Sequence, residues 1–307
     1  MLDNPVLKQR FESYELRIMR SLNVRTKLSI KCAGYYSNLE KGFKGEQMFD
    51  VLSEGIRTGF YFINDLLLEH NNNEFQIDSL LISEKIIYPI DVKNFEGDYY
   101  IDNGKWYPKN GIEMKNPLHQ LSRSETLLKG LLNAIGYSFQ MSPHLCFINP
   151  NFYLYQAPLN HPLVFPTQLN RFINTLNKVD SKLNNHHLKF SETLISLHKP
   201  KSSTSKIPSY SYENLEKGII CCTCNSSFTV SQGNLLLCEK CGCAESVDDG
   251  ILRSVKELIL LFPDHKITTN GIYEWSGGNI SKKRIRRILC QNFKLVGHSS
   301  SSHFINQ

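Results

Sequence analysis

The sequence predicts an α/β fold in which a mixed central sheet is flanked by helices, followed by a small cysteine-rich domain and a helical C-terminal region. Short segments rich in β-branched and aromatic residues follow one another between residues 61 and 108. Segments with apolar residues at helical spacing lie before and after them. Six of the nine cysteines are gathered between residues 221 and 243.

The elements of the first half follow from these patterns in order. Residues 1 to about 40 are expected to be helical, with a second helix over 44–54. Strands are expected next, over 61–70, 75–83, 85–95 and 97–108. Asp102-Asn103-Gly104 makes the last of these a tight hairpin. Asn116-Pro117 opens a further helix, and the half closes with a strand over 144–149 and helices over 167–178 and 186–198.

Composition divides the chain into five expected parts. A helical extension, 1–37, precedes an α/β domain with trailing helices, 38–198. A linker rich in lysine, serine and proline begins at 199 and extends to 214. The cysteine-rich domain covers 215–247 and the basic helical region covers 248–307.

The bulk properties restrict location and partners. No apolar run approaches the ~20 residues that span a bilayer, and the N-terminus lacks the apolar block of a secretory signal. We therefore expect a cytoplasmic protein without a membrane partner. The formal net charge of +6 permits a nucleic-acid partner without requiring one.

Asp78, Asp91 and Lys93 form the first group of residues that indicates chemistry. Asp91 and Lys93 are two positions apart, so on a strand they project from the same face. If Ser83 and Glu84 form the turn between the strands, Asp78 and Asp91 lie near one another across the strand pair. Two carboxylates can hold Mg²⁺, and an adjacent ammonium can orient a water or stabilise a pentacovalent phosphate.

The same spacing also occurs in solvent-exposed ion pairs, which have no catalytic role. The neighbours argue against that alternative, because Asp91 follows the apolar run 86–90 and Asp78 lies among Ile77, Leu80 and Leu81. Charges in such apolar strands are costly unless they are paired or bind a metal.

Four short motifs in order resemble the nuclease-related domain (NERD) family of the PD-(D/E)xK nuclease superfamily. They are GFKGE at 42–46, QID at 76–78, IDVKNFEG at 90–97 and NPLHQ at 116–120. The resemblance covers about residues 38 to 150 and implies a restriction-endonuclease-like fold. In the family the second acid is often glutamate, where this chain has Asp91, and Ile77 stands where the superfamily label has proline.

The resemblance also assigns roles by position. It implies metal-binding acids at Glu46, Asp78 and Asp91, a catalytic lysine at Lys93 and a supporting polar residue at Gln120. Arg123, on the same expected helix as Gln120, could contact a nucleic-acid backbone. Both side chains could equally face solvent, and His119 is taken as an ordinary surface or core histidine.

The cysteine cluster predicts a structural zinc site. Cys221, Cys224, Cys238 and Cys241 form two C-x-x-C pairs separated by residues 225–237. Each pair turns tightly enough to present two thiolates to one Zn²⁺, and a hairpin between the pairs closes a zinc ribbon. The alternatives are reduced cysteines without an ion, or a redox pair. Cys222 and Cys243 are not part of either C-x-x-C pair.

The C-terminal region resembles a winged helix-turn-helix. Ser281 is expected to cap a basic helix that follows two others, and the segment after it could form a two-stranded wing. The predicted nucleic-acid-binding cations are Lys282, Lys283, Arg284, Arg286 and Arg287. A solvated basic face without a partner is the alternative.

Two functions are compatible with these features. The first is a nuclease that hydrolyses DNA, or RNA, with Mg²⁺ or Mn²⁺ as cofactor and structural Zn²⁺ in the ribbon. The second is a catalytically inactive nucleic-acid-binding or regulatory protein that keeps the nuclease-like scaffold. The complete acid–acid–lysine set favours the first, and the sequence identifies no protein partner.

Overall fold

The computed structural model describes residues 5–57, 59–159, 161–225, 228–298 and 302–306. It separates into two compact units. Unit 1 comprises Met1–Ser13 and Asn38–Ser205, and unit 2 comprises Tyr14–Ser37 and Lys206–Gln307. The boundary after residue 205 falls inside the expected linker, whereas the expected N-terminal extension is divided between the units.

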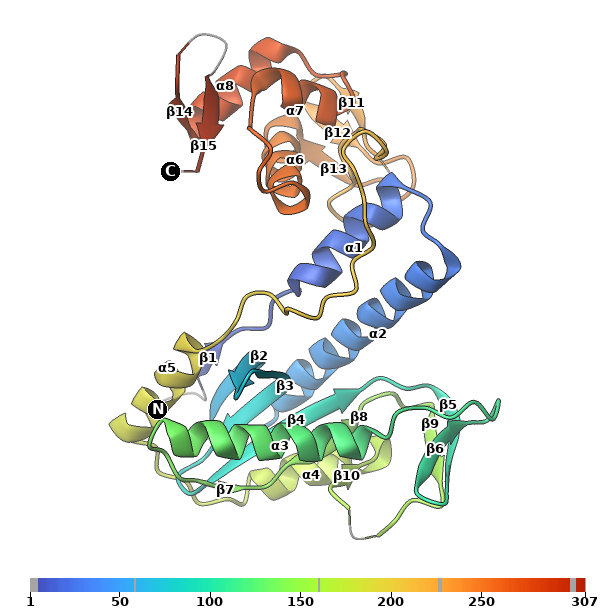
Figure 1. Cartoon of the computed structure of the whole chain (residues 1–307), viewed down its shortest axis with the longest axis vertical. Coiled ribbons are helices and arrows are strands. Elements are labelled where there is room, and N and C mark those ends of the chain that lie inside the picture. Colours follow the sequence, from blue (N-terminus) through green and yellow to red (C-terminus); the bar gives the residue numbers. More distant parts are fainter. Residues whose placement is uncertain (1–4, 58, 160, 226–227, 299–301, 307) are drawn as a thin grey trace. The chain divides into compact units, whose positions relative to one another are not determined.

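A mixed sheet forms the centre of unit 1 (Figure 1). Its strand order is β1-β2-β3-β4-β8-β10, and β7 also pairs with β4. The antiparallel strands β2, β3 and β4 follow one another directly, while β8 and β10 add in parallel. The strands are β1 (Val6–Lys8), β2 (Tyr61–His70), β3 (Asn73–Ile82), β4 (Ile86–Lys93), β7 (Gln140–Met141), β8 (His144–Phe147) and β10 (Leu163–Val164).

Helices cover both faces of this sheet. On one face, Phe49 of α2 (Ile30–Ser53) and Ile173 of α4 (Leu169–Leu176) pack with Val92. A short 3-10 helix, η1 (Pro166–Gln168), precedes α4. On the other face, Leu128 of α3 (Pro117–Ala134) and Phe190 of α5 (Asn185–Ser196) pack with Ile87. The expected mixed sheet flanked by helices is therefore present.

The first two strands of the antiparallel set are distorted at one point. Ile63 and Leu66 share a core cluster, as do Ile77 and Leu80, although each pair is three positions apart. In a regular strand, residues on one face are two positions apart. The alternation between the two faces is therefore interrupted between the members of each pair. Asp65 takes a φ of 54° at this point, which L-residues seldom adopt. Asp78 is the residue of β3 that lies at the distortion.

A second, smaller sheet carries the expected hairpin. Its order is β6-β5-β9, with β5 (Gly97–Asp102), β6 (Lys105–Pro108) and β9 (Phe152–Tyr155). Asn103 and Gly104 make the turn, both at positive φ, as a tight hairpin requires. Trp106, Phe147 and Phe152 form the core beneath it. The helix expected at Asn116-Pro117 is α3, whose N-terminal Leu118 N–H is accepted by the Asn116 side chain.

Unit 2 contains one helix from the N-terminal part of the chain, α1 (Tyr14–Arg25), and the first residues of α2. Its small sheet has the order β11-β12-β13, and β14 pairs with β15 in the segment for which a two-stranded wing was expected. The remaining elements are β11 (Val230–Gln232), β12 (Leu235–Leu237), β13 (Ala244–Ser246), α6 (Val247–Leu261), α7 (Thr269–Trp275), α8 (Lys282–Asn292), β14 (Lys294–Val296) and β15 (His303–Ile305).

The N-terminal region differs from the expected continuous helix. Val6 and Lys8 pair in parallel with β2, so strand pairing with a distant segment overrides the local helical spacing. The helix expected over 44–54 is the second half of α2, which begins at Ile30. None of the described helices is long and apolar enough to cross a membrane.

Candidate active site and metal centre

Asp78, Asp91 and Lys93 come together where β3 and β4 separate. The β3–β4 ladder ends with Ser79 opposite Ile90, and Asp78 and Asp91 follow this last pair. The Asp78 carboxylate then takes the place of a strand partner, because its Oδ2 accepts the Val92 N–H at 2.7 Å. The antiparallel arrangement expected from the sequence thus places the two acids near each other.

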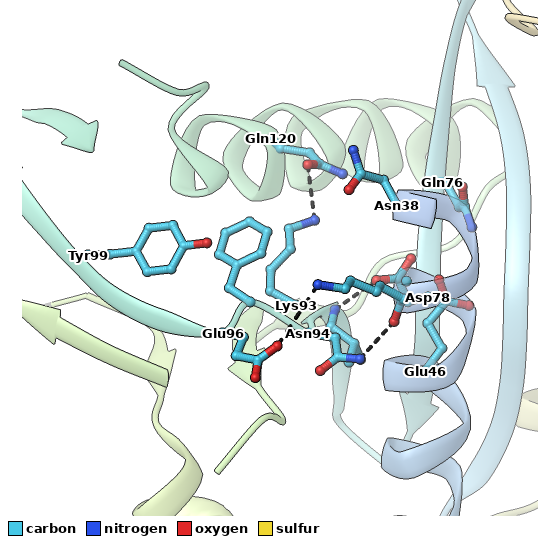
Figure 2. A pocket seen from close by; sticks show the side chains of 13 residues that line it. Asn38, Glu46, Gln76, Asp78, Lys93, Asn94, Glu96, Tyr99 and Gln120 are labelled. Carbon is cyan, nitrogen blue, oxygen red and sulfur yellow. Dashed lines mark hydrogen bonds and ion pairs between the residues drawn. The ribbon is translucent and has the colours of Figure 1, made fainter. Parts of the chain in front are cut away.

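Lys93 connects the second acid to helix α3. Its Nζ lies 2.6 Å from Asp91 Oδ1 and donates to Gln120 Oε1 at 3.1 Å. Figure 2 shows the lysine side chain pointing toward Gln120, with Asp78 and Glu46 grouped beside α2. Gln120 therefore lies at the site, as the resemblance implies.

An open cavity of about 640 Å³ exposes this arrangement to solvent. Glu46, Asp78, Lys93 and Gln120 line it, whereas Asp91 does not and is only 8 % exposed. Gly45 permits the close approach of α2, because a Cβ at this position would lie 2.5 Å from Asn94 Cβ. The glycine before Glu46 thus lets the helix acid reach the two strands.

The carboxylates of this site raise one another's affinity for protons. Burial, and then the charge of Asp91, raise the pKa of Asp78 to about 6. Burial, and then the charge of Asp78, raise the pKa of Glu46 to about 8. Burial also raises the pKa of Asp91, although Lys93 opposes this. The charged forms of these buried acids are therefore costly in the protein alone, and a bound cation would offset that cost.

Lys93 remains protonated in this environment. Burial by itself would lower its pKa, but the charges of Asp91 and Asp78 more than offset that effect, and the pKa is raised. The side chain is therefore a hydrogen-bond donor and a positive charge at neutral pH, and not a general base.

The acid site has the chemistry of a site for a hard divalent cation. Its donors are carboxylate oxygens, which Mg²⁺ prefers, and Asp91 Oδ1 is buried without a hydrogen bond of normal geometry. The three carboxylates are not gathered as closely as a bound ion would require. Among the described residues, one group of ligand atoms is gathered in this way, and it is the cysteine cluster.

The four cysteines Cys221, Cys224, Cys238 and Cys241 bring their Sγ atoms within 4.8 Å of one another. The closest contacts join the two C-x-x-C pairs. The Sγ of Cys221 lies 3.6 Å from that of Cys241, and the Sγ of Cys224 lies 3.7 Å from that of Cys238. This arrangement is compatible with the expected zinc ribbon. Of the two remaining cysteines, Cys222 Sγ lies 3.4 Å from Cys243 Sγ.

A second cavity of about 830 Å³ shares Lys93, Phe95 and Gln120 with the first. Arg123 lines it, and its guanidinium donates to the Glu74 carbonyl at 3.2 Å. His119 is exposed and also lines this cavity. Neither residue belongs to the acid site itself.

The five cations of helix α8 fall into two kinds. Arg284 and Arg287 each lie 2.6 Å from Asp248 of α6 and so help to hold the helices of unit 2 together. Lys282, Lys283 and Arg286 are exposed. As expected, the Ser281 side chain accepts the Arg284 N–H and caps the helix.

One residue of the acid site has no signal in the sequence. Arg10 donates to Glu46 and Asp50, and its side chain is only 3 % exposed. It lies in the segment for which a helix was expected, 36 positions before Glu46. No local pattern marks a contact over that distance.

Comparison with known proteins identifies the region that carries this site. No curated protein and no solved structure matches the chain. A family model described as nuclease-related domain (NERD) matches residues 41–148, which include Glu46, Asp78, Asp91, Lys93 and Gln120. Residues 41–148 of this 307-residue chain therefore carry a nuclease-related domain.

Proposed function

We propose that the chain is a metal-dependent nuclease that hydrolyses phosphodiester bonds of nucleic acid, with DNA the favoured substrate. The observation that carries this proposal is the single cavity at which two acids, a lysine and a glutamine meet. Glu46, Asp78, Lys93 and Gln120 line it, and Asp91 pairs with the lysine. This is the donor set that a PD-(D/E)xK site requires, and it lies inside the nuclease-related domain.

In this proposal Glu46, Asp78 and Asp91 hold Mg²⁺, or Mn²⁺. When bound, the ion supplies Lewis-acid stabilisation of the phosphate and a water of lowered pKa. Asp78 is held for this role by the Val92 N–H. Protonated Lys93 donates to the attacking water or to a phosphate oxygen, where negative charge develops. Gln120 accepts from Lys93 and fixes the direction of its side chain.

The second cavity extends the proposed path of the substrate. It continues from Lys93 and Gln120 past Lys105, Lys115 and Arg123. Positive side chains along such a path suit the phosphates that flank the bond to be cut. In unit 2, the exposed Lys282, Lys283 and Arg286 of α8 would add contacts to phosphates, and Zn²⁺ would hold the ribbon.

The experiment is a cleavage assay with single- and double-stranded DNA and RNA, in Mg²⁺ and in Mn²⁺. Asp91→Ala and Lys93→Ala should each lower the cleavage rate by about a hundredfold or more. Lys109→Ala is the matched control, since its side chain is 83 % exposed, pairs with Asp98 at 3.3 Å and does not belong to the lining of either cavity. A protein that cuts none of these substrates, or variants that cut as well as wild type, would contradict the proposal.

One observation favours the inactive alternative. Lys93 lies 2.6 Å from Asp91, and the three carboxylates are not gathered around a common point. A chain kept in this state would bind nucleic acid in a salt-sensitive way without turnover. Salt-dependent binding to DNA or RNA, with no cleavage and no binding of Mg²⁺ or Mn²⁺, would support this alternative.

A further inference from the structure

Arg10 is a buried arginine that reaches the acid site from outside the matched domain. It belongs to the segment before α1, whereas the family match begins at residue 41. Its side chain is 3 % exposed, and its guanidinium makes hydrogen bonds to four other residues of unit 1. A charged group buried to this extent is costly unless its surroundings are built for it.

The first set of contacts holds helix α2. Nη1 lies 2.6 Å from Glu46 Oε2. Nε and Nη2 donate to the two oxygens of Asp50 at 2.8 and 3.0 Å, the fork geometry that only arginine provides. Glu46 and Asp50 are four positions apart and therefore share one face of the helix. One guanidinium thus fixes two successive turns of α2.

The second set of contacts holds strand β3. Nη2 also donates to the Asp78 carbonyl at 2.8 Å and to Ser79 Oγ at 2.9 Å. The same side chain consequently joins the helix acid Glu46 to the backbone that carries the strand acid Asp78. These are the two acids that line the cavity.

Arg10 makes these contacts without entering the cavity. It is not among the residues that line it. It contacts Glu46 through Oε2 and Asp78 through its backbone carbonyl, while the side chains of both acids line the cavity. The contacts suit a residue that positions metal ligands, and such partners of ligands tune metal affinity strongly.

The segment around Arg10 contacts β2 through its backbone and through the side chain of Lys8. Val6 and Lys8 pair in parallel with β2. Lys8 Nζ donates to the carbonyls of Asn64 and Asp65 at 2.9 and 2.7 Å. Asp65 is the point at which β2 is distorted, beside the part of β3 that carries Asp78. Two cations of one short segment therefore hold the distorted strands and the helix of the acid site.

We propose that Arg10 is a positioning residue of the active site, which holds Glu46 and the Asp78 backbone in place for the divalent cation. This inference rests on the proposed function. It adds a residue from outside the matched domain, and it makes residues 5–13 part of the proposed nuclease.

The test measures Mn²⁺ binding to the full chain by calorimetry, and cleavage as a function of Mn²⁺ concentration. Arg10→Lys keeps the charge but loses the fork to Asp50. We expect the Mn²⁺ concentration for half-maximal binding and cleavage to rise by roughly 10- to 100-fold, with most of the maximal rate recovered at saturating Mn²⁺. Arg57→Lys is the matched control, because Arg57 is exposed in the same unit. This control should leave both values unchanged.

A double variant separates positioning from a general loss of stability. If Arg10 acts through Glu46, Arg10→Lys should weaken Mn²⁺ binding much less in a Glu46→Gln background than in wild type. Equal losses in both backgrounds, or unchanged Mn²⁺ affinity of Arg10→Lys, would overturn the inference. If Arg10→Lys does not fold, Asp50→Asn takes its place, because it disrupts the same paired hydrogen bonds between the Arg10 guanidinium and the Asp50 carboxylate. The outcomes that support or overturn the inference are the same for this variant.

The proposed function can fail separately. A wild-type chain that binds Mn²⁺ and loses this binding in Asp78→Ala, but cleaves nothing, contradicts the nuclease proposal while Arg10 is still tested by affinity. A wild-type chain that binds no Mn²⁺ at these acids contradicts both.

Discussion

At the scale of single residues, burial and neighbouring charges together set the pKa values of the acid site. Asp78 and Lys93 lie in the same buried setting, yet both have raised pKa values. For the acid, burial and a like charge act in one direction; for the lysine, two carboxylates outweigh burial. The result is a lysine that stays charged beside acids that favour a cation. The spacing of Asp91 and Lys93 in the sequence suggests that they pair. The pKa values of the acids and the lysine, however, depend on how the rest of the unit excludes solvent from them.

His144 gives a prediction for the pH dependence of stability. Burial lowers its pKa, while its Nδ1 lies 2.9 Å from the Ser142 carbonyl and its ring lies 4.8 Å from that of Phe172. The unfolded chain therefore binds this proton more readily than the folded chain. The stability from neutral His144 is fully present above the unfolded pKa of about 6.5, and it is lost as the pH falls from that value through the lower pKa of the folded state.

His144→Phe should remove this component while keeping an aromatic ring against Phe172. We expect the free energy of unfolding of the variant, measured with urea, to fall less than that of wild type between pH 7.5 and pH 5.5. Parallel curves for the two proteins would show that His144 does not contribute to the acid dependence.

At the scale of elements, the site depends on how closely α2 approaches the end of β4. Gly45 is buried, and Asn94 on the other side is fixed by a hydrogen bond from its Nδ2 to the Lys41 carbonyl at 2.8 Å. The GFKGE motif at 42–46 contains two glycines that look alike in the sequence. Only the structure distinguishes them, because a Cβ at Gly42 would have nothing within 4 Å.

Gly45→Ala should therefore separate α2 from β4. The new Cβ would meet Asn94 Cβ at 2.5 Å, and this atom cannot swing away as the end of a long side chain could. We expect a loss of about 1–3 kcal/mol in the free energy of unfolding, together with weaker metal-dependent cleavage, because Glu46 moves with the helix. Both quantities are measured for purified protein, by urea denaturation and by the cleavage assay.

Gly42→Ala is the control within the same motif and helix. It should be neutral or stabilise by up to about 1 kcal/mol, because alanine favours the helix and the space is open. Equal effects of the two substitutions would show that the close approach at Gly45 does not set the position of Glu46.

At the scale of the whole molecule, the N-terminal residues are shared between the two units. Residues 5–13 add a strand and Arg10 to unit 1, whereas α1 belongs to unit 2. There the fully buried Arg25 pairs with Glu257 at 2.6 Å and lies 3.9 Å from the Trp275 ring centre. Each unit thus contains a buried arginine from the N-terminal part of the chain, and this arginine contacts residues that are distant in the sequence.

The small sheet of unit 2 consists of very short strands, so we expect it to depend on Zn²⁺. Its strands have three residues each, and a sheet of this size is marginal without a metal. Purified chain should contain one zinc per molecule by atomic absorption. Cys224→Ser, or a strong chelator, should remove the zinc and lower the melting temperature of unit 2.

Cys290→Ser is the matched control for this prediction, because Cys290 is exposed and lies outside the cluster. Its zinc content should equal that of wild type. A wild-type chain without zinc, or a Cys224→Ser variant that keeps it, would show that the cluster is not a zinc site.

The sequence by itself determined the local and periodic features of this protein. Short segments rich in β-branched and aromatic residues predicted β2, β3 and β4. Turn residues predicted the hairpin at Asn103-Gly104, and capping residues predicted the starts of α3 and α8. The sequence also placed Asp78 near Asp91, since an antiparallel turn brings the ends of its two strands together, whereas the observed register, with Ile82 opposite Ile87, differs from a turn at Ser83 and Glu84. The spacing of the two C-x-x-C pairs was sufficient to predict that their four cysteines form one cluster.

The tertiary structure decided what depends on contacts between distant segments. The strand at Val6–Lys8 exists because β2 offers it a partner, and α2 begins at Ile30, well before the start expected at Lys44. Arg10 meets Glu46 across 36 positions, and Arg284 and Arg287 pair with Asp248 across 36 and 39 positions. Ion pairs and strand pairing of this kind are chosen by the packed fold, and no local period in the sequence encodes them.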